Sequence, residues 1–214
     1  MKQINQFLAD HKIIAIVRGV NTDLPQLAQA LYDGGIRAME FTFDPGCPDG
    51  WEKTSAAIRT VGSSMAGKMA VGAGTVTSTA LVRLAFDAGA QFIISPDTNI
   101  DVIRAAKELG MASIPGAMTP TEIETAYLAG ADFVKVFPAG VLGPAYVKAV
   151  RGPLGYIPLM AVGGVSEKNI AAFLEAGCVG AGVGGNLVNK EWIAAGQWDR
   201  ITALARQLCE QAGV

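Results

Sequence analysis

Five glycines end helix-like segments, and a short apolar run begins within a few residues of each one. This recurring unit limits the possible folds more than any other feature of the chain. The five are Gly35, Gly89, Gly110, Gly130 and Gly177. Successive glycines are 54, 21, 20 and 47 residues apart, so each long interval has room for two units and each short interval for one. This spacing is typical of a helix, a C-terminal glycine and a strand.

The segments between these glycines carry apolar residues at helical spacing. Several open with Asp, Asn, Thr or Ser, which favour the N-cap of a helix. We predict helices in LPQLAQALYD from Leu24, STALVRLAFDA from Ser78, NIDVIRAAKEL from Asn99, TPTEIETAYLA from Thr119, SEKNIAAFLEA from Ser166 and WDRITALARQLCEQ from Trp198. A short N-terminal helix through Phe7 and Leu8 would complete the outer layer.

The runs that follow the helices are almost continuously apolar, as in strands covered on both faces. The eight runs are IIAIV from Ile13, MEFTF from Met39, KMAVGA from Lys68, QFIISP from Gln91, MASIP from Met111, FVKVF from Phe133, LMAV from Leu159 and VGAGVG from Val179. Eight strands that alternate with helices predict a parallel sheet closed into a (β/α)8 TIM barrel, one domain over residues 1–214. A doubly wound open sheet has the same alternation, and we favour the barrel over it.

Composition excludes several classes of function. Seventeen Lys plus Arg against 19 Asp plus Glu leave a net charge of -2, so we expect no nucleic acid and no anionic membrane as a partner. We find no signal peptide and no membrane span. The three cysteines lack zinc-site spacing, and His11 is the only histidine, which leaves no His-based triad or metal site. We therefore expect a cytoplasmic protein with a small-molecule partner.

Lys135 is the unusual residue among the strand ends, where the reactive groups of a parallel barrel gather. It lies inside FVKVF, a run with no other polar side chain. Burial lowers the pKa of a lysine from about 10.4, and the neutral amine is a nucleophile toward carbonyl carbon. Alternatively, Lys135 extends to the strand end or pairs with a carboxylate such as Glu40. Because the strand is otherwise apolar, we favour a functional role for Lys135.

Glu40 is the second candidate for the barrel interior. Alternation along MEFTF places Glu40 and Thr42 on one face and Met39, Phe41 and Phe43 on the other, under the helices. A carboxyl group near Lys135 can transfer protons while a carbinolamine forms and collapses. A buried ion-pair partner of Lys135 would occupy the same place, and the pattern leaves both roles open.

Glycine pairs end the last two predicted strands, and an arginine ends the first. Backbone amides approach a phosphate closely only where no side chain intervenes, although tight turns also require glycine. Arg18 can bind a carboxylate or a phosphate through its fork of donors, or form a surface salt bridge. The glycine pairs belong to the segments Gly163-Gly164 and Gly184-Gly185-Asn186.

Seven motifs occur together in this chain from about Ile13 to Val188. They are IVRG from Ile16, the Glu of MEFTF, VGAGTV from Val71, ISPDTN from Ile94, IPGAMTPTE from Ile114, FVKVFPA from Phe133 and AVGGVS from Ala161. In order and spacing this set resembles the 2-keto-3-deoxy-6-phosphogluconate / 4-hydroxy-2-oxoglutarate aldolase family.

The resemblance implies a class I aldolase without metal or cofactor, which cleaves a 2-keto-3-deoxy-6-phospho sugar acid to pyruvate and glyceraldehyde 3-phosphate. It implies that Lys135 forms the Schiff base and that Glu40 is the general acid and base. The pyruvate and carboxylate pocket would comprise Arg18, Thr75, Pro96, Pro115, Gly116 and Phe137, and the phosphate would be bound by Gly163, Gly164, Gly184, Gly185 and Asn186. Family members typically form trimers, so a homotrimer is expected.

The chain departs from the family pattern at two places. Asp44 stands where gluconate-type enzymes carry an arginine, four residues after the catalytic glutamate, so either Arg18 takes the substrate carboxylate or substrate preference has shifted. A Ser or Thr common among phosphate ligands is replaced by Val162 or Asn186. A gluconate-derived, galactonate-derived or shorter hydroxy-keto acid substrate would need the same lysine chemistry.

Two other functions are weighed against the aldolase. One is a phosphosugar isomerase or epimerase that uses Glu40 as a base without a covalent intermediate. The other is a catalytically idle barrel that binds sugar acid phosphates. Trapping an imine on Lys135 would separate the aldolase from both of them.

Overall fold

The computed structural model describes residues 2–214 and contains one parallel sheet in the order β5-β4-β3-β2-β1-β9-β8-β7-β6. The strands are β1 (Ile13–Val17), β2 (Ala38–Thr42), β3 (Ala70–Gly74), β4 (Phe92–Ile94), β5 (Ala112–Ile114), β6 (Gly116–Ala117), β7 (Val134–Val136), β8 (Leu159–Val162) and β9 (Gly180–Val183). The two ends of this order, β5 and β6, are separated in the chain by Pro115 alone. The fifth predicted strand ends at Pro115, which has no backbone N–H, and β6 follows it as a short strand beyond the predicted run. The sheet is therefore a nearly closed (β/α)8 barrel, as predicted.

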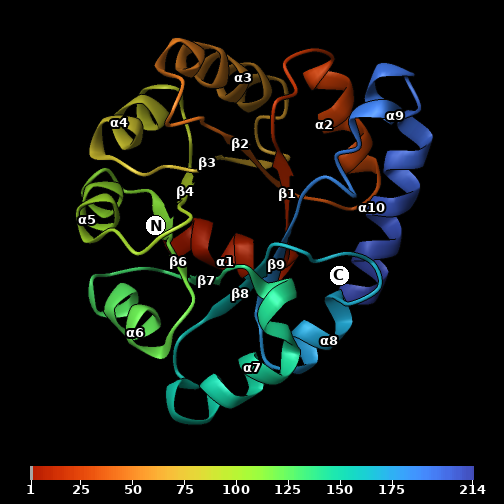
Figure 1. Ribbon diagram of the computed structural model, residues 1–214. Helices are drawn as coiled ribbons and strands as arrows, with labels where there is room; N and C mark the ends of the chain where they lie inside the picture. The colour runs from red at the N-terminus through yellow and green to blue at the C-terminus, as the bar shows by residue number, and fades with distance from the viewer. Residues whose placement is uncertain (1) are drawn as a thin grey trace.

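Helices surround the strands, and Figure 1 shows α1 (Lys2–His11) within the ring that the other helices form. The outer helices are α2 (Leu24–Asp33), α3 (Trp51–Ser64), α4 (Thr79–Asp87), α5 (Ile100–Glu108), α6 (Pro120–Leu128), α7 (Ala139–Leu154), α8 (Ile170–Glu175), α9 (Lys190–Ala194) and α10 (Trp198–Ala212), with a 3-10 turn, η1, at Pro48–Gly50. Within residues 2–214, none of the helices combines the length and the hydropathy that a membrane span demands.

The local signals act as predicted at most helix ends. Ser78, Asn99 and Thr119 each accept a backbone N–H of their own helix through the side chain, and Thr119 forms a capping box with Glu122. The five glycines that end predicted helices, called the marker glycines below, have φ between 77° and 106°. This left-handed conformation costs other residues energy.

The prediction of a helix from Ser166 is wrong at its start, because α8 begins only at Ile170. The Asn169 side chain accepts the Ser166 N–H at 2.8 Å and donates to the Gly164 carbonyl at 2.9 Å. These two hydrogen bonds hold residues 166–169 in a turn. Helix α7 was not predicted: it contains Pro144 and Pro153, and Gly143 interrupts it at φ 76° and ψ 165°.

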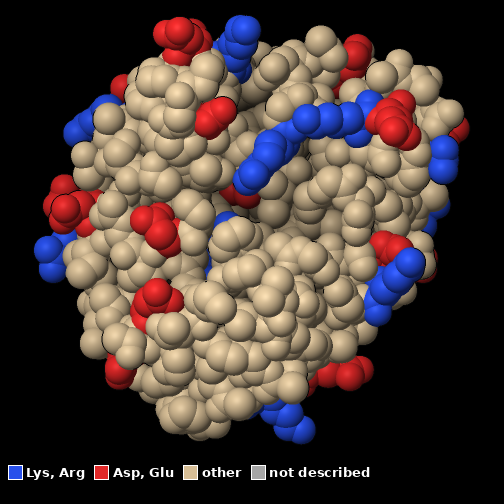
Figure 2. All heavy atoms as spheres, viewed as in Figure 1, with Lys and Arg blue, Asp and Glu red and all other residues tan. Residues whose placement is uncertain are grey.

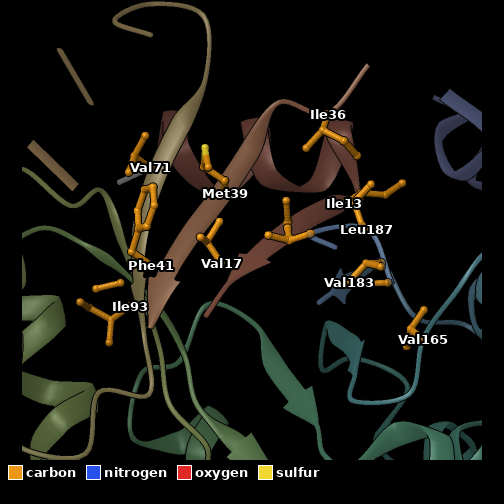
Figure 3. Close-up of a cluster of buried hydrophobic side chains, with 14 of the residues drawn as sticks. Ile13, Val17, Ile36, Met39, Phe41, Val71, Ile93, Val165, Val183 and Leu187 are labelled. Atoms are coloured by element: carbon orange, nitrogen blue, oxygen red, sulfur yellow. The ribbon is translucent and has the colours of Figure 1, made fainter. Parts of the chain in front are cut away.

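Two apolar layers hold the barrel together. The outer layer lies between strands and helices and includes Met39 and Phe41, labelled in Figure 3. The inner layer joins Leu8 of α1 to the inward-facing side chains of the strands, among them Ile14, Phe92 and Met160. Helix α1 therefore fills the amino-terminal end of the barrel, and the carboxyl ends of the strands are left for a site.

Candidate active site

A cavity of about 720 Å³ opens at the carboxyl ends of the strands. It brings together all but two of the residues predicted for the site. The lining comprises Ile16, Arg18, Glu40, Thr75, Pro96, Lys135, Phe137, Val162, Gly163, Gly164, Val165, Gly182, Gly184, Gly185, Asn186, Val188 and Lys190. Strands on opposite sides of the barrel therefore contribute to one cavity.

Lys135 projects from β7 into this cavity and is 7% exposed. Its Nζ lies 4.4 Å from the centroid of the Phe137 ring. Among the described residues it forms no salt bridge within 4.0 Å, so neither a solvated nor an ion-paired lysine fits. Burial lowers the pKa of Lys135, and Glu40 opposes this effect only in part. The structure thus favours the neutral amine more than bulk water does.

Glu40 projects from the middle of β2 and is 2% exposed. Its Oε2 atom has no hydrogen-bond partner within residues 2–214. Burial raises the pKa of Glu40 to about 7, against the opposing effects of Lys135 and Arg18. A β-carbon at Gly74 would lie 2.6 Å from the Glu40 carboxyl carbon, so the neighbouring strand needs glycine there.

The pKa values of these two groups move toward each other, because burial disfavours the charge on both. A carboxyl that titrates near pH 7 can donate and accept a proton in the same catalytic cycle. An amine whose pKa is lowered can attack a carbonyl carbon. The pair is therefore suited to imine chemistry accompanied by proton transfer.

Arg18 stands at the junction of this cavity and a second one of about 420 Å³. Its Nη2 donates to Thr75 Oγ1 at 3.5 Å. Thr75 also lines both cavities, and its left-handed φ of 57° is a strained conformation of the kind found at functional sites. Asp44 lines only the second cavity, where its carboxylate accepts the Gly46 N–H. We therefore infer that Arg18, and not the residue at position 44, binds a substrate carboxylate beside Lys135.

The glycine pairs after β8 and β9 form the wall opposite Thr75. Gly163 and Gly164 have φ values of 88° and 80°, and a β-carbon at Gly163 would lie 3.1 Å from the Phe137 ring. Position 163 thus requires glycine for two reasons, its left-handed backbone conformation and its close approach to the Phe137 ring. Figure 2 shows Lys and Arg atoms extending across a hollow near the centre of this face, with Asp or Glu atoms beneath them.

Pro115 and Gly116, which were predicted to shape the pyruvate pocket, are not among the residues that line the cavity. Both are buried. The Pro115 carbonyl accepts the Lys135 N–H at 2.8 Å, and Gly116 pairs in register with Lys135. A β-carbon at Gly116 would also lie 2.5 Å from the Pro96 carbonyl carbon. These two residues position the strand that carries the lysine.

Sequence reasoning missed several lining residues, of which Lys190 is the charged one. It lies at the start of α9, seven residues after β9 ends, so proximity to a strand end did not indicate it. In residues 2–214, no group of three or more His, Cys, Asp or Glu side chains is placed to hold a metal ion.

Comparison with known proteins relates this site to one family. A family model described as KDPG and KHG aldolase matches residues 4–204. The Escherichia coli K12 2-dehydro-3-deoxy-6-phosphogalactonate aldolase is 39% identical over 178 residues, 82% of this chain and 83% of the relative.

Two solved structures extend the similarity to the fold. KDPG aldolase from Legionella pneumophila, captured with pyruvate as a covalent carbinolamine intermediate, has a TM-score of 0.83 at 25% identity and covers 95% of this chain and 97% of its own. A cube-shaped protein cage designed by fusing symmetric oligomeric domains has a TM-score of 0.82 at 33% identity, covering 94% of this chain and 71% of its own.

Proposed function

This chain belongs to the KDPG and KHG aldolase family, and we propose that it cleaves a 2-keto-3-deoxy-6-phospho sugar acid into pyruvate and glyceraldehyde 3-phosphate. The observation that carries this proposal is the placement of Lys135 and Glu40. Both are buried, neither is engaged in a salt bridge among the described residues, and both line one cavity walled by glycine loops.

The cavity can hold the substrate at three points. Arg18, with Thr75 beside it, faces the C1 carboxylate. Lys135 meets the C2 ketone, and the Phe137 ring packs against its ammonium or imine nitrogen. The glycine loops after β8 and β9 receive the phosphate, because backbone amides there are not covered by side chains. Such positioning supplies much of the catalytic effect in a bimolecular reaction.

The reaction begins when the neutral Lys135 amine adds to C2 and gives a carbinolamine. Glu40 donates a proton to the departing hydroxyl group, and the loss of water leaves a protonated imine and an ionised Glu40. Glu40 takes the proton of the C4 hydroxyl, the C3–C4 bond breaks, and its electron pair moves into the imine to form an enamine. The aldehyde leaves, and Glu40 returns a proton to C3 through a water molecule. Hydrolysis of the imine releases pyruvate and restores the amine.

Borohydride reduction in the presence of pyruvate tests the covalent step. Hydride reduces the imine carbon, so the protein should gain the mass of one carboxyethyl group, and peptide mapping should locate that group on Lys135. The protein treated with borohydride alone is the control. Absence of an adduct on wild-type protein would contradict an imine mechanism and return the choice to the isomerase or the binding barrel.

We also propose that the protein is a homotrimer. The α6–α7 face, defined by Met118, Tyr127, Leu128, Val141 and Tyr156, exposes large apolar side chains, with Leu128 76% and Val141 79% exposed. Figure 2 shows few charged atoms over α7. Patches of this kind mark protein contact surfaces. This chain is similar to part of the chain of a cage designed by fusing symmetric oligomeric domains, which supports an oligomeric state.

Sedimentation equilibrium should give a mass near three times the 22.2 kDa of one chain. A Leu128→Glu variant should sediment as a smaller species, because a charge would be buried in the interface. Phe86→Glu, on the exposed surface of α4, is the matched control and should leave the mass unchanged. A monomeric wild-type protein would contradict the proposal. A cytoplasmic location stays a prediction.

A further inference from the structure

Two cations, Arg18 and Lys190, stand at the mouth of the Lys135 cavity. Both are exposed, and the only carboxylate in the lining is the buried Glu40. Neither cation forms a salt bridge within the part of the chain that the structure describes. The mouth of the cavity therefore carries positive charge that no carboxylate of the lining offsets at the surface.

Lys190 reaches the mouth because Gly19 makes room for it. A β-carbon at Gly19 would lie 3.0 Å from Lys190 Nζ, and Gly19 has a left-handed φ of 63°. The ammonium group thus packs over the turn that directly follows Arg18. No carboxylate in the lining pairs with this exposed ammonium group, so a bound anion would supply its counter-charge.

The two cations differ in what surrounds them in the cavity. Arg18 donates to Thr75 and perturbs the pKa of both Lys135 and Glu40, which places it at the reacting end. Lys190 comes four residues after the loop of Gly184, Gly185 and Asn186, and it lines the cavity together with that loop. A substrate anchored at Lys135 would extend its distal end toward that loop.

We propose that Lys190 binds the terminal phosphate of the substrate and so makes this site select phosphorylated over unphosphorylated keto acids. The inference rests on the proposed aldolase function. A phosphate dianion accepts charge-assisted hydrogen bonds from a lysine, whereas the distal hydroxyl of an unphosphorylated 2-keto-3-deoxy sugar acid carries no charge that could pair with Lys190. Lys190 is therefore a specificity-determining residue that takes no part in making or breaking bonds.

A Lys190→Met variant should raise KM for 2-keto-3-deoxy-6-phosphogluconate or its galactonate epimer about tenfold, with kcat within about twofold of wild type. Cleavage of 2-keto-3-deoxygluconate, the same substrate without its phosphate, should keep its kcat/KM. Lys190→Arg should restore most of the affinity because it keeps the charge. Lys168→Met is the matched control: Lys168 is exposed on the neighbouring loop after β8 and lines no described cavity, so its loss changes net charge alone.

Calorimetric titration with inorganic phosphate gives a readout that does not depend on turnover. The dissociation constant should rise about tenfold in Lys190→Met and stay unchanged in Lys168→Met. Equal losses for phosphorylated and unphosphorylated substrates, or unchanged phosphate affinity, would overturn the role of Lys190. Failure of wild-type protein to form the pyruvate adduct would instead overturn the proposed function, so the two failures are distinguishable.

Discussion

Replacing Lys135 with methionine should reduce carbon–carbon cleavage by about 10⁴-fold or more, because no other described amine in the cavity is buried beside Glu40. Methionine has a similar length and no nucleophile, so the cavity keeps its shape. The borohydride adduct with pyruvate should disappear together with the activity. Steady-state cleavage coupled to pyruvate detection, with mass spectrometry of the reduced protein, measures both results.

Measuring the stability of Lys135→Met distinguishes the loss of the catalytic amine from a failure to fold. The folded state lowers the pKa of Lys135 below its usual 10.5, so at neutral pH the unfolded chain holds that proton more tightly than the folded chain does. The contribution of Lys135 to stability therefore falls as pH falls below 10.5, and Lys135→Met lacks this contribution. We expect the variant to melt at least as high as wild type at pH 7.

Lys135→Arg is the companion variant. Arginine keeps a positive charge in the cavity, but its guanidinium does not form an imine under these conditions. Activity should be as low as in Lys135→Met. Substantial cleavage by Lys135→Arg would contradict covalent catalysis and would indicate that the lysine acts only through its charge.

The spacing of apolar residues and the glycines that end predicted helices were sufficient to predict the barrel. The marker glycines adopt the left-handed conformation for which a helix C-terminus selects them, and LMAV from Leu159 coincides with β8. The alternation along MEFTF placed Glu40 in the cavity and Met39 and Phe41 under the helices. These features are local, because each depends on a residue and its immediate neighbours in the chain.

What could not be predicted depends on contacts between distant segments. The start of α8 is delayed by hydrogen bonds of Asn169, which compete with a helical turn that the sequence pattern permits. Lys190 enters the site because Gly19, 171 residues earlier in the chain, leaves space for it. The role of Pro115 also follows from geometry, since its carbonyl holds the strand of Lys135 and its ring lines no described cavity.

Replacing Glu40 with glutamine should lower kcat by about 10²- to 10⁴-fold, the range typical of a lost general acid and base. The amide has the shape of the carboxyl group but cannot take the proton of the C4 hydroxyl. Wild-type kcat should rise with pH through about 7, where Glu40 loses its proton, and this limb should be absent in the variant. Lys135 remains intact, so the pyruvate adduct should still form after longer incubation.

Stability against pH gives a second test of the same carboxyl group. Burial raises the pKa of Glu40 from 4.5 to about 7, so between these values the folded chain keeps a proton that the unfolded chain releases. The stabilisation from that proton is fully present below pH 4.5 and is lost as pH rises through 7. Glu40→Gln escapes the loss and should be more stable than wild type at pH 8, by roughly 3 kcal/mol at most.

At pH 4 the two proteins should differ little, because Glu40 is protonated in both the folded and the unfolded wild-type chain. Urea unfolding at pH 4 and pH 8 measures the difference directly. If Glu40→Gln is slower in catalysis and more stable only at high pH, then burying the Glu40 carboxyl group costs stability and serves catalysis. If Glu40→Gln were instead less stable than wild type at pH 8, Glu40 would be a structural ion-pair partner of Lys135, and the proton transfers would have to be assigned to another group.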